Sequence, residues 1–236
     1  MVDVPLPRRA LAEFLGSAFL VATVIGSGIA AARLSPGDTG LQLFENAAAT
    51  AAGLATFILM FGPISGAHFN PVVSLVDVAL GHRTRRDLAA YVPAQIAGCI
   101  VGAIVANAMF DLPAVSISTT HRASGPHLFA EIVATVGLLL LIFSLARTGR
   151  SHLAPAAVGA YIGAAYFFTS STSFANPAID IGRAFSDTFA GIAPASVPGF
   201  IAAQLIGAMP ALALITVLYP EPGDERRRDQ PAPAPE

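Results

Sequence analysis

Two Asn-Pro dipeptides, Asn70-Pro71 and Asn176-Pro177, stand in corresponding places in the two halves of an apolar chain. Asn is a preferred helix N-cap because its side-chain oxygen accepts a hydrogen bond from the first turn, and Pro at the next position has no N–H to leave unpaired. Capping uses the amide oxygen and leaves the NH₂ group able to donate elsewhere. Two such helix starts inside a membrane would direct two positive dipole ends and two amide donors at one point. This arrangement suits a pore for uncharged solutes.

The composition indicates a membrane protein. Of the 236 residues, 54% are hydrophobic and 12% are charged, whereas about 25% of residues are charged in a typical soluble domain. All basic residues other than His are arginine, and the net charge of −2 argues against a nucleic-acid partner. The single cysteine, Cys99, lies in an apolar run and is expected to pack between helices. No cleavable signal peptide is expected, because the first apolar run is long enough to span.

Six apolar segments approach the ~20 residues that a membrane helix needs. Two shorter segments begin at the Asn-Pro pairs, Pro71–Leu80 and Pro177–Phe189, and at ~1.5 Å per residue each covers about half of the hydrocarbon core. They must enter and return, and the loops before them are tolerated there only if they are buried in protein or line water. The expected fold is an all-α membrane protein with six transmembrane helices and two re-entrant half-helices. The six spans are Ala10–Ala32, Phe44–Phe61, Leu88–Phe110, Phe129–Ala146, Leu153–Phe168, which is the shortest, and Val197–Leu218.

The two halves carry the same landmarks in the same order. Glu13 and Glu131 each lie in the first span of a half, an Asn-Pro pair follows, and Gln95 and Gln204 lie in the last span, where we expect them to make interhelical hydrogen bonds. Each repeat has three spans, an odd number, so the second repeat is inverted relative to the first. The two half-helices then enter from opposite faces and meet near the midplane.

The arginines are distributed unevenly between the two sets of connections, and the positive-inside rule places both termini and the first Asn-Pro loop in the cytoplasm, for a protein of the cell's inner membrane. We divide the chain into a cytoplasmic N-terminus (1–9), a membrane domain (10–219) with repeats at about 10–110 and 127–219, and a Pro-rich cytoplasmic tail (220–236) expected to be disordered. The inner set comprises Arg8, Arg9, Arg83, Arg85, Arg86, Arg147, Arg150 and Arg226 to Arg228, and the outer set comprises Arg33, Arg122 and Arg183.

These motifs resemble those of the major intrinsic proteins, the aquaporins and aquaglyceroporins, over about residues 8–219. The resemblance rests on AEFLGSAFL, SGAHFNPVVSL, STSFANPA and the two Ala-Gln helices, PAQIAGCIVGA and AAQLIGA. A lone Asn-Pro-Ala box is a weak signal, but two boxes in the right places of an inverted repeat are a strong one. The resemblance implies one pore per protomer in a homotetramer, and passive conduction of water and small uncharged solutes. It implies no cofactor, no catalysis and no passage of protons or ions.

The resemblance also implies roles for particular residues. The amides of Asn70 and Asn176 would hydrogen-bond a passing solute oxygen at the centre of the pore. Glu13 and Glu131 are ionisable residues within spans, where they are costly; the resemblance implies that they brace the pore loops, and the alternative is proton coupling. His68 either lines the cytoplasmic half of the pore or makes a structural hydrogen bond. The other residues expected along the pore are Ala67, Phe174 and Ala175.

The outer constriction departs from the family pattern. Most members carry Arg three residues after the second Asn, which narrows the pore and repels cations, whereas this chain has Ile179. Counting from the boxes puts Thr50 and Ser173 at two further filter positions. The fourth is Tyr166 or Ala164, depending on how the preceding loop is aligned. This selectivity filter would be uncharged and wider than a filter for water alone.

Asp180 and Arg183 follow Ile179 in the second half-helix. An acid at position 180 resembles the glycerol-conducting subgroup. Arg183 either pairs with Asp180, three residues earlier, or reaches the outer mouth and partly replaces the missing arginine. NPV in the first box and Ile179 after the second resemble a bacterial branch associated with metalloids, so arsenite and methylated arsenicals join glycerol as candidate solutes.

Two other classes of function compete with a channel. A secondary transporter also uses inverted repeats and broken helices, and Glu13 and Glu131 would then couple transport to an ion. An intramembrane enzyme is disfavoured, because the spans contain no metal-ligating cluster and no nucleophile–base spacing.

Overall fold

The computed structural model describes residues 4–220, which form eight α-helices, two short 3-10 helices and no strand. The all-α prediction is therefore confirmed for this part of the chain. The elements are α1 (Leu6–Leu34), α2 (Thr39–Ser65), α3 (Pro71–Ala79), α4 (Arg85–Met109), α5 (Gly125–Arg147), η1 (Ser151–Leu153), α6 (Ala154–Phe168), α7 (Pro177–Arg183), η2 (Pro194–Ser196) and α8 (Val197–Leu218).

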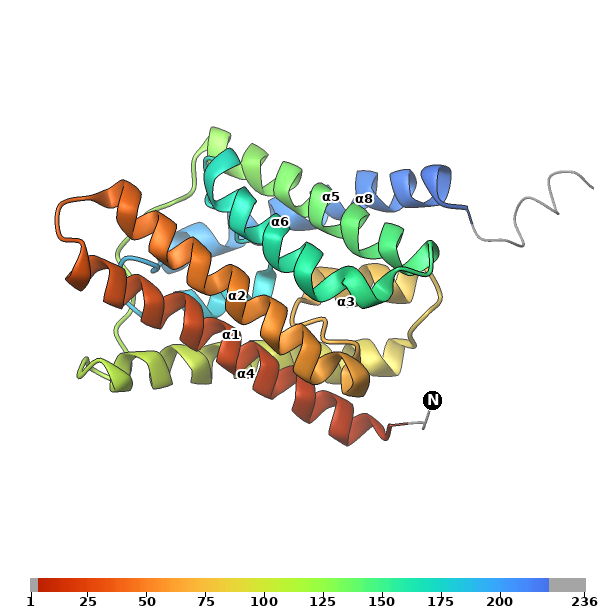
Figure 1. Ribbon diagram of the computed structural model, residues 1–236, viewed down its shortest axis with the longest axis horizontal. Coiled ribbons are helices and arrows are strands. Elements are labelled where there is room, and N and C mark those ends of the chain that lie inside the picture. Colours follow the sequence, from red (N-terminus) through yellow and green to blue (C-terminus); the bar gives the residue numbers. More distant parts are fainter. Residues whose placement is uncertain (1–3, 221–236) are drawn as a thin grey trace, which may run out of the picture.

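Six helices form the wall of a bundle, with α1, α2 and α4 from the first repeat and α5, α6 and α8 from the second (Figure 1). Five of them, all but α6, are long and apolar enough to cross a membrane. Helix α6 has 15 residues and rises only about 22 Å. It packs against α2, where a Cβ at Gly159 would collide with the carbonyl oxygen of Ala51.

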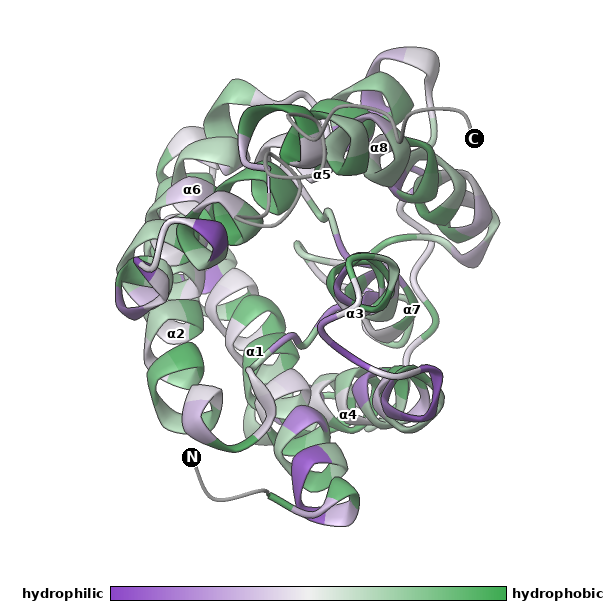
Figure 2. Ribbon diagram, turned by 90° about the vertical axis from the view of Figure 1, so that its right-hand side faces the viewer, coloured by the Kyte–Doolittle hydropathy of each residue, from purple (hydrophilic) through white to green (hydrophobic). Residues whose placement is uncertain are grey.

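The two half-helices complete this wall on one side. Figure 2 shows α3 and α7 one behind the other between α4 and α8, against which both pack. Their N-termini face each other, because the cap of α3, Asn70, bonds to the loop before α7, and the cap of α7, Asn176, bonds to the loop before α3. This is the geometry expected of an inverted repeat.

The end of the second half-helix differs from the prediction. Helix α7 ends at Arg183, not at Phe189, because the backbone beyond it is engaged by the segment between α4 and α5. The N–H of Ser118 donates to the Ala184 carbonyl at 2.9 Å, and residues 184–196 form turns and η2. Helix α3 ends at Ala79, one residue before the predicted Leu80.

Small residues let the helices of each repeat approach closely at equivalent points. A Cβ at Gly98 in α4 would collide with the carbonyl oxygen of Phe14 in α1, and a Cβ at Gly207 in α8 would crowd that of Ile132 in α5. Backbone contact of this kind is characteristic of packing between membrane helices. It brings the glutamine one turn before each glycine within reach of the buried glutamate of the neighbouring helix.

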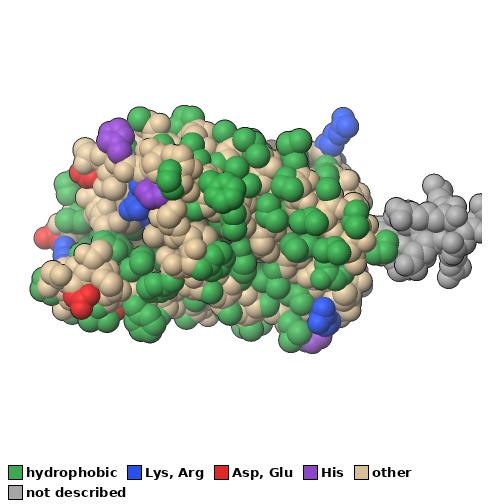
Figure 3. Space-filling view, turned by 90° about the horizontal axis from the view of Figure 1, so that it is seen from above, with side chains coloured by type: hydrophobic (Ala, Val, Ile, Leu, Met, Phe, Trp, Pro, Cys, Tyr) green, Lys and Arg blue, Asp and Glu red, His purple; other side chains and the backbone are tan. Residues whose placement is uncertain are grey.

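The surface is consistent with a bilayer environment. Figure 3 shows hydrophobic side chains over the middle of the molecule, with charged and His side chains near its two ends. The start of α1 and the end of α8 lie at the same end of the bundle (Figure 1), as expected for termini on one side of a membrane. The tail predicted to be disordered lies outside the described residues, except for Pro220.

Candidate functional site

Each asparagine caps its half-helix as the sequence predicts. The side-chain oxygen of Asn70 accepts a hydrogen bond from the N–H of Val72 at 2.9 Å. That of Asn176 accepts from Ala178 at 3.0 Å and from Ile179 at 3.3 Å. Capping of this kind stabilises a helix by about 1 kcal/mol, and it fixes the direction in which each NH₂ group points.

The NH₂ groups join the two repeats. Asn70 Nδ2 donates to the Ala175 carbonyl at 2.7 Å, and Asn176 Nδ2 donates to the Phe69 carbonyl at 2.8 Å. Each NH₂ group thus donates away from its own helix, and one N–H of each holds the opposite loop. One N–H of each amide remains for another acceptor.

The loops before the half-helices carry left-handed residues at equivalent positions. Ala67 and Phe69 have φ of 51° and 50°, and Ser173 and Ala175 have φ of 51° and 46°. This conformation costs an L-residue about 1–2 kcal/mol. Its consequence is that consecutive backbone N–H groups converge on one point, as in an anion-binding nest.

Glu13 occupies that point in the first repeat. Its carboxylate accepts hydrogen bonds from the backbone N–H of His68 at 3.0 Å and of Phe69 at 2.7 Å. It also accepts from the Ser65 hydroxyl at 2.6 Å and the Gln95 amide at 2.8 Å. Glu13 is fully buried, so these four donors take the place of water around the carboxylate.

Glu131 repeats the arrangement in the second half. Its carboxylate accepts from the backbone N–H of Phe174 at 2.9 Å and of Ala175 at 2.7 Å, and from the Gln204 amide at 2.8 Å. It is also fully buried. The two glutamates thus bind the same backbone positions, one and two residues before each asparagine.

A cavity of about 1000 Å³ lies beside α3 and α7 within the bundle. Ala175 departs from its predicted place along the pore, because it is fully buried and not part of the lining; its carbonyl receives the Asn70 amide. Of the two alternatives for the fourth filter position, Tyr166 lines the cavity and Ala164 is exposed and does not. The predicted residues in the lining are Thr50, Ala67, His68, Asn70, Tyr166, Ser173, Phe174, Asn176 and Ile179.

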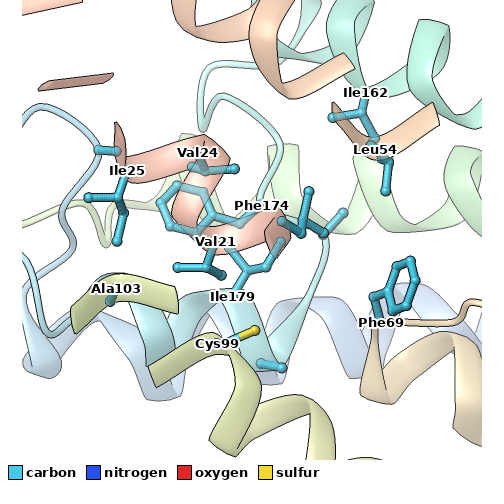
Figure 4. Packing of buried hydrophobic residues seen from close by; sticks show 14 of the residues in the cluster. Val21, Val24, Ile25, Leu54, Phe69, Cys99, Ala103, Ile162, Phe174 and Ile179 are labelled. Atoms are coloured by element: carbon cyan, nitrogen blue, oxygen red, sulfur yellow. The ribbon is translucent and has the colours of Figure 1, made fainter. Parts of the chain in front are cut away.

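The four predicted filter residues form an uncharged part of this lining. The hydroxyls of Thr50 and Tyr166 lie 3.2 Å apart and share a hydrogen bond. The hydroxyl of Ser173 is buried and, among residues 4–220, has no hydrogen-bond partner. In Figure 4, Ile179 lies near Phe174, and Leu54 of α2 lies across from them. The four filter residues therefore contribute three hydroxyl groups and one aliphatic side chain to the lining.

Of the two alternatives for Arg183, the ion pair with Asp180 is not formed: within the part of the chain that the structure describes, no ion pair joins them. Its Nε donates to the Ala190 carbonyl, and its guanidinium carbon lies 3.6 Å from the centroid of the Phe174 ring. Arg122, in the segment before α5, approaches the same ring at 5.6 Å. Burial lowers the pKa of Arg122, although a guanidinium stays protonated in proteins.

A cluster at the other end of the cavity was not predicted from the sequence. Asp77 of α3 lies 3.3 Å from His68 Nε2, 3.1 Å from His82 Nδ1 and 3.5 Å from Arg83 Nε. His68 Nδ1 also lies 3.0 Å from the Ser74 hydroxyl, so His68 both lines the cavity and makes structural hydrogen bonds. An acid inside an apolar half-helix was the signal that could have drawn attention to Asp77.

Comparison with known proteins agrees with this architecture. The chain matches the family model described as major intrinsic protein over residues 1–188. It is 47% identical over 235 residues to aquaglyceroporin AqpS of Rhizobium meliloti (strain 1021), covering all of both chains. It is 30% identical over 222 residues to the glycerol uptake facilitator protein of Pseudomonas aeruginosa, covering 81% of this chain and 78% of that protein.

A solved structure has the same fold. The aquaglyceroporin from Plasmodium falciparum superposes with a TM-score of 0.73 at 20% identity, covering 92% of this chain and 98% of that one. The family match, the full-length similarity and the shared fold agree with the paired half-helices described above. The chain belongs to the major intrinsic protein family.

Proposed function

We propose that this protein is a passive transmembrane channel for water and small uncharged solutes such as glycerol. The observation that carries the proposal is the cavity along which Asn70 and Asn176 each present an amide with one N–H uncommitted. A solute oxygen at this point could accept from both amides and so recover part of the hydrogen bonding that it loses on leaving water. Members of this family are channels and not enzymes.

Passive conduction is favoured over coupled transport by the state of the two buried acids. Glu13 and Glu131 accept hydrogen bonds from four and three neutral donors and lie behind the pore loops. Neither lines the cavity. We therefore assign them to bracing the strained loops and not to binding a coupling ion.

The lining supports a solute range wider than water. We propose that Thr50, Tyr166, Ser173 and Ile179 form the selectivity filter, since they combine hydroxyl groups with one aliphatic wall and carry no charge. A filter of this kind suits polyols and neutral hydroxides, and we include arsenite and methylated arsenicals among the candidate solutes. The names of the relatives, an aquaglyceroporin and a glycerol uptake facilitator, support glycerol.

We further propose that protons are excluded, although Ile179 replaces the usual arginine. The N-termini of α3 and α7 direct positive dipole ends at the midplane, and the amides orient water around them. The arginine distribution supports an inner-membrane protein with both termini in the cytoplasm. We propose assembly as a homotetramer, as the family resemblance implies.

Stopped-flow light scattering of proteoliposomes tests the channel directly. Water, glycerol and arsenite gradients are applied to one preparation, with empty liposomes and Asn176→Asp proteoliposomes of equal protein content as controls. We expect the flux of water, glycerol and arsenite to exceed the flux in both controls, and the flux of glycerol and arsenite to rise linearly with their concentration. A pH-sensitive dye should show no proton leak. The absence of flux above empty liposomes for all three solutes would overturn the proposal. Saturable uptake that requires an ion gradient would favour a transporter.

A further inference from the structure

Arg183 lies on the same face of α7 as Ile179. The two residues are four apart in one helix, a spacing that places side chains on one face and separates them by about 6 Å along the axis. Both line the cavity. The positive charge in this half-helix is therefore one turn farther from the midplane than the position where most family members carry arginine.

The guanidinium is fixed in this position by two contacts. Its Nε donates to the Ala190 carbonyl, and its carbon lies 3.6 Å from the centroid of the Phe174 ring, a cation–π contact. Phe174 is itself held, because its backbone N–H donates to Glu131. Within residues 4–220, the Nε bond is the only hydrogen bond that Arg183 donates, so its terminal nitrogens can donate to a solute in the cavity.

No acid in the cavity lining neutralises this charge at its own end. Asp77 is the only acidic residue among the described lining residues, and it belongs to the cluster with His68 and Arg83 at the opposite end. Two acids near Arg183, Asp180 and Glu131, are fully buried and do not line the cavity. The charge that the described lining carries at this end is therefore positive, and a pore entrance lined by charge of one sign and apolar walls attracts the opposite charge and repels its own.

We infer that Arg183 is a specificity-determining residue that selects by charge at the outer mouth, one turn before solutes reach the uncharged ring containing Ile179. The inference rests on the proposed channel function and assigns selection by charge and selection by size to different residues. Arg183 repels cations and donates hydrogen bonds to oxygens of neutral solutes, whereas Thr50, Tyr166 and Ile179 select by size. A wide filter can thus exclude cations without an arginine in its own plane.

The potential just inside Arg183 can be measured with a thiol at position 179. The native Cys99 is fully buried, so Ile179→Cys supplies a single accessible thiol. Two methanethiosulfonate reagents, ethylsulfonate (anionic) and ethyltrimethylammonium (cationic), are applied from the outer side in low salt. Rates are normalised to those of a small free thiol. We expect the anionic reagent to react about tenfold or more faster than the cationic one, as charged clefts concentrate counter-ions by 10-fold or more.

Removing the charge of Arg183 should remove the preference for the anionic reagent. In the Ile179→Cys background, Arg183→Gln should lower the anionic-to-cationic rate ratio by about tenfold, whereas Arg183→Lys should keep most of it. Arg33→Gln is the matched control, because it removes one positive charge from the end of α1 at a residue that does not line the cavity. This control should leave the ratio within about twofold of its starting value, because Arg33 is exposed to solvent and lies outside the cavity, where the high dielectric constant of water weakens its field.

Three outcomes are decisive even if Arg183→Gln fails to fold. In Ile179→Cys alone, the ratio should fall toward one as salt rises from 10 mM to 1 M, over which the Debye length shrinks from about 30 to 3 Å. A ratio near one at low salt, with water and glycerol flux intact, overturns the role of Arg183 and leaves the channel standing. If neither reagent reacts and no solute passes, the proposed channel function falls as well.

Discussion

The two repeats share one framework and differ at the ends of the pore. In each repeat a buried glutamate binds two consecutive N–H groups of a left-handed loop, a glutamine supports that glutamate, and an asparagine caps the half-helix. Each asparagine then holds the loop of the other repeat. Two differences that change the charge of the lining lie two residues before and seven residues after each asparagine.

At those two positions each repeat pairs an aromatic ring of the loop with a charged residue of the half-helix, and the charged residues have opposite signs. In the first repeat His68 pairs with Asp77 at 3.3 Å, and in the second Phe174 stacks on Arg183 at 3.6 Å. All four side chains line the cavity. His82 and Arg83 surround Asp77, whereas no acid of the lining offsets Arg183. Shared residues therefore build the passage, and the exchanged pairs give its two mouths different electrostatics.

The largest effect is expected from breaking the shared framework at its acids. Glu13→Gln places an NH₂ donor among donors that now bond to a carboxylate, and each hydrogen bond to a charged group contributes about 1.5–3 kcal/mol. We expect water flux to fall by more than tenfold, and the free energy of unfolding to fall by roughly 3 kcal/mol. Stopped-flow measurements and thermal unfolding in detergent check both.

Glu131→Gln sharpens this test, because Glu131 accepts three hydrogen bonds where Glu13 accepts four. Its losses should follow the same direction and be smaller. Unchanged stability and flux in both variants would mean that the carboxylates do not hold the loops. A large loss in only one variant would mean that the repeats are not equivalent.

The next effect concerns the exchange between the two asparagines. Asn70→Asp sets a carboxylate oxygen against the Ala175 carbonyl, and Asn176→Asp sets one against the Phe69 carbonyl, where an N–H now donates. Losing such a buried pairing costs about 1–3 kcal/mol, and we expect similar loss of stability and about tenfold lower water flux in both. Asn→Ser variants, which remove the amide without adding charge, serve as controls. Unequal effects of the two Asp variants would show that the two asparagines do not contribute equally to holding the loops at the midplane.

Much of this framework could be predicted from the sequence. The spans follow from lengths of apolar chain, so their positions agree with the prediction to within a few residues at most ends. The caps follow from the chemistry of Asn followed by Pro, and Glu13 and Glu131 stand out because an acid within a span needs a partner. Each of these signals can be found within a short stretch of sequence, or by comparing the two halves of the chain.

The features that were missed depend on contacts between distant segments. Helix α7 stops at Arg183 because the backbone beyond it binds residues between α4 and α5. The NH₂ groups of both asparagines donate to carbonyls of the other repeat, which no local pattern identifies. The pairing of Arg183 with Phe174, and not with Asp180, requires the left-handed loop that turns the ring toward α7.

A smaller effect, confined to larger solutes, is expected at the outer constriction. Ile179→Arg adds a second guanidinium one turn inside Arg183 and narrows the ring. Glycerol flux should fall about tenfold and water flux less than threefold, because a fixed fork of donors narrows the pore for the larger solute first. Ile179→Leu, which keeps volume and adds no charge, should change neither by more than twofold. Equal loss of water and glycerol flux in Ile179→Arg would mean that residue 179 is not at the constriction.

The smallest effect should come from the hydroxyl pair of the filter. Tyr166→Phe keeps the ring and removes the oxygen that lies 3.2 Å from Thr50 Oγ1. A neutral hydrogen bond of this kind contributes about 1 kcal/mol, so stability should fall by no more than that and water flux should stay near that of the wild type. Glycerol flux should change by less than threefold, since size and not this hydroxyl governs passage. Thr50→Val removes the other hydroxyl of the pair and should have the same effects on stability and flux as Tyr166→Phe. A tenfold loss of glycerol flux alone in both variants would instead show that the pair binds solute hydroxyls. Part of the selection would then take place in the filter and not at the outer mouth.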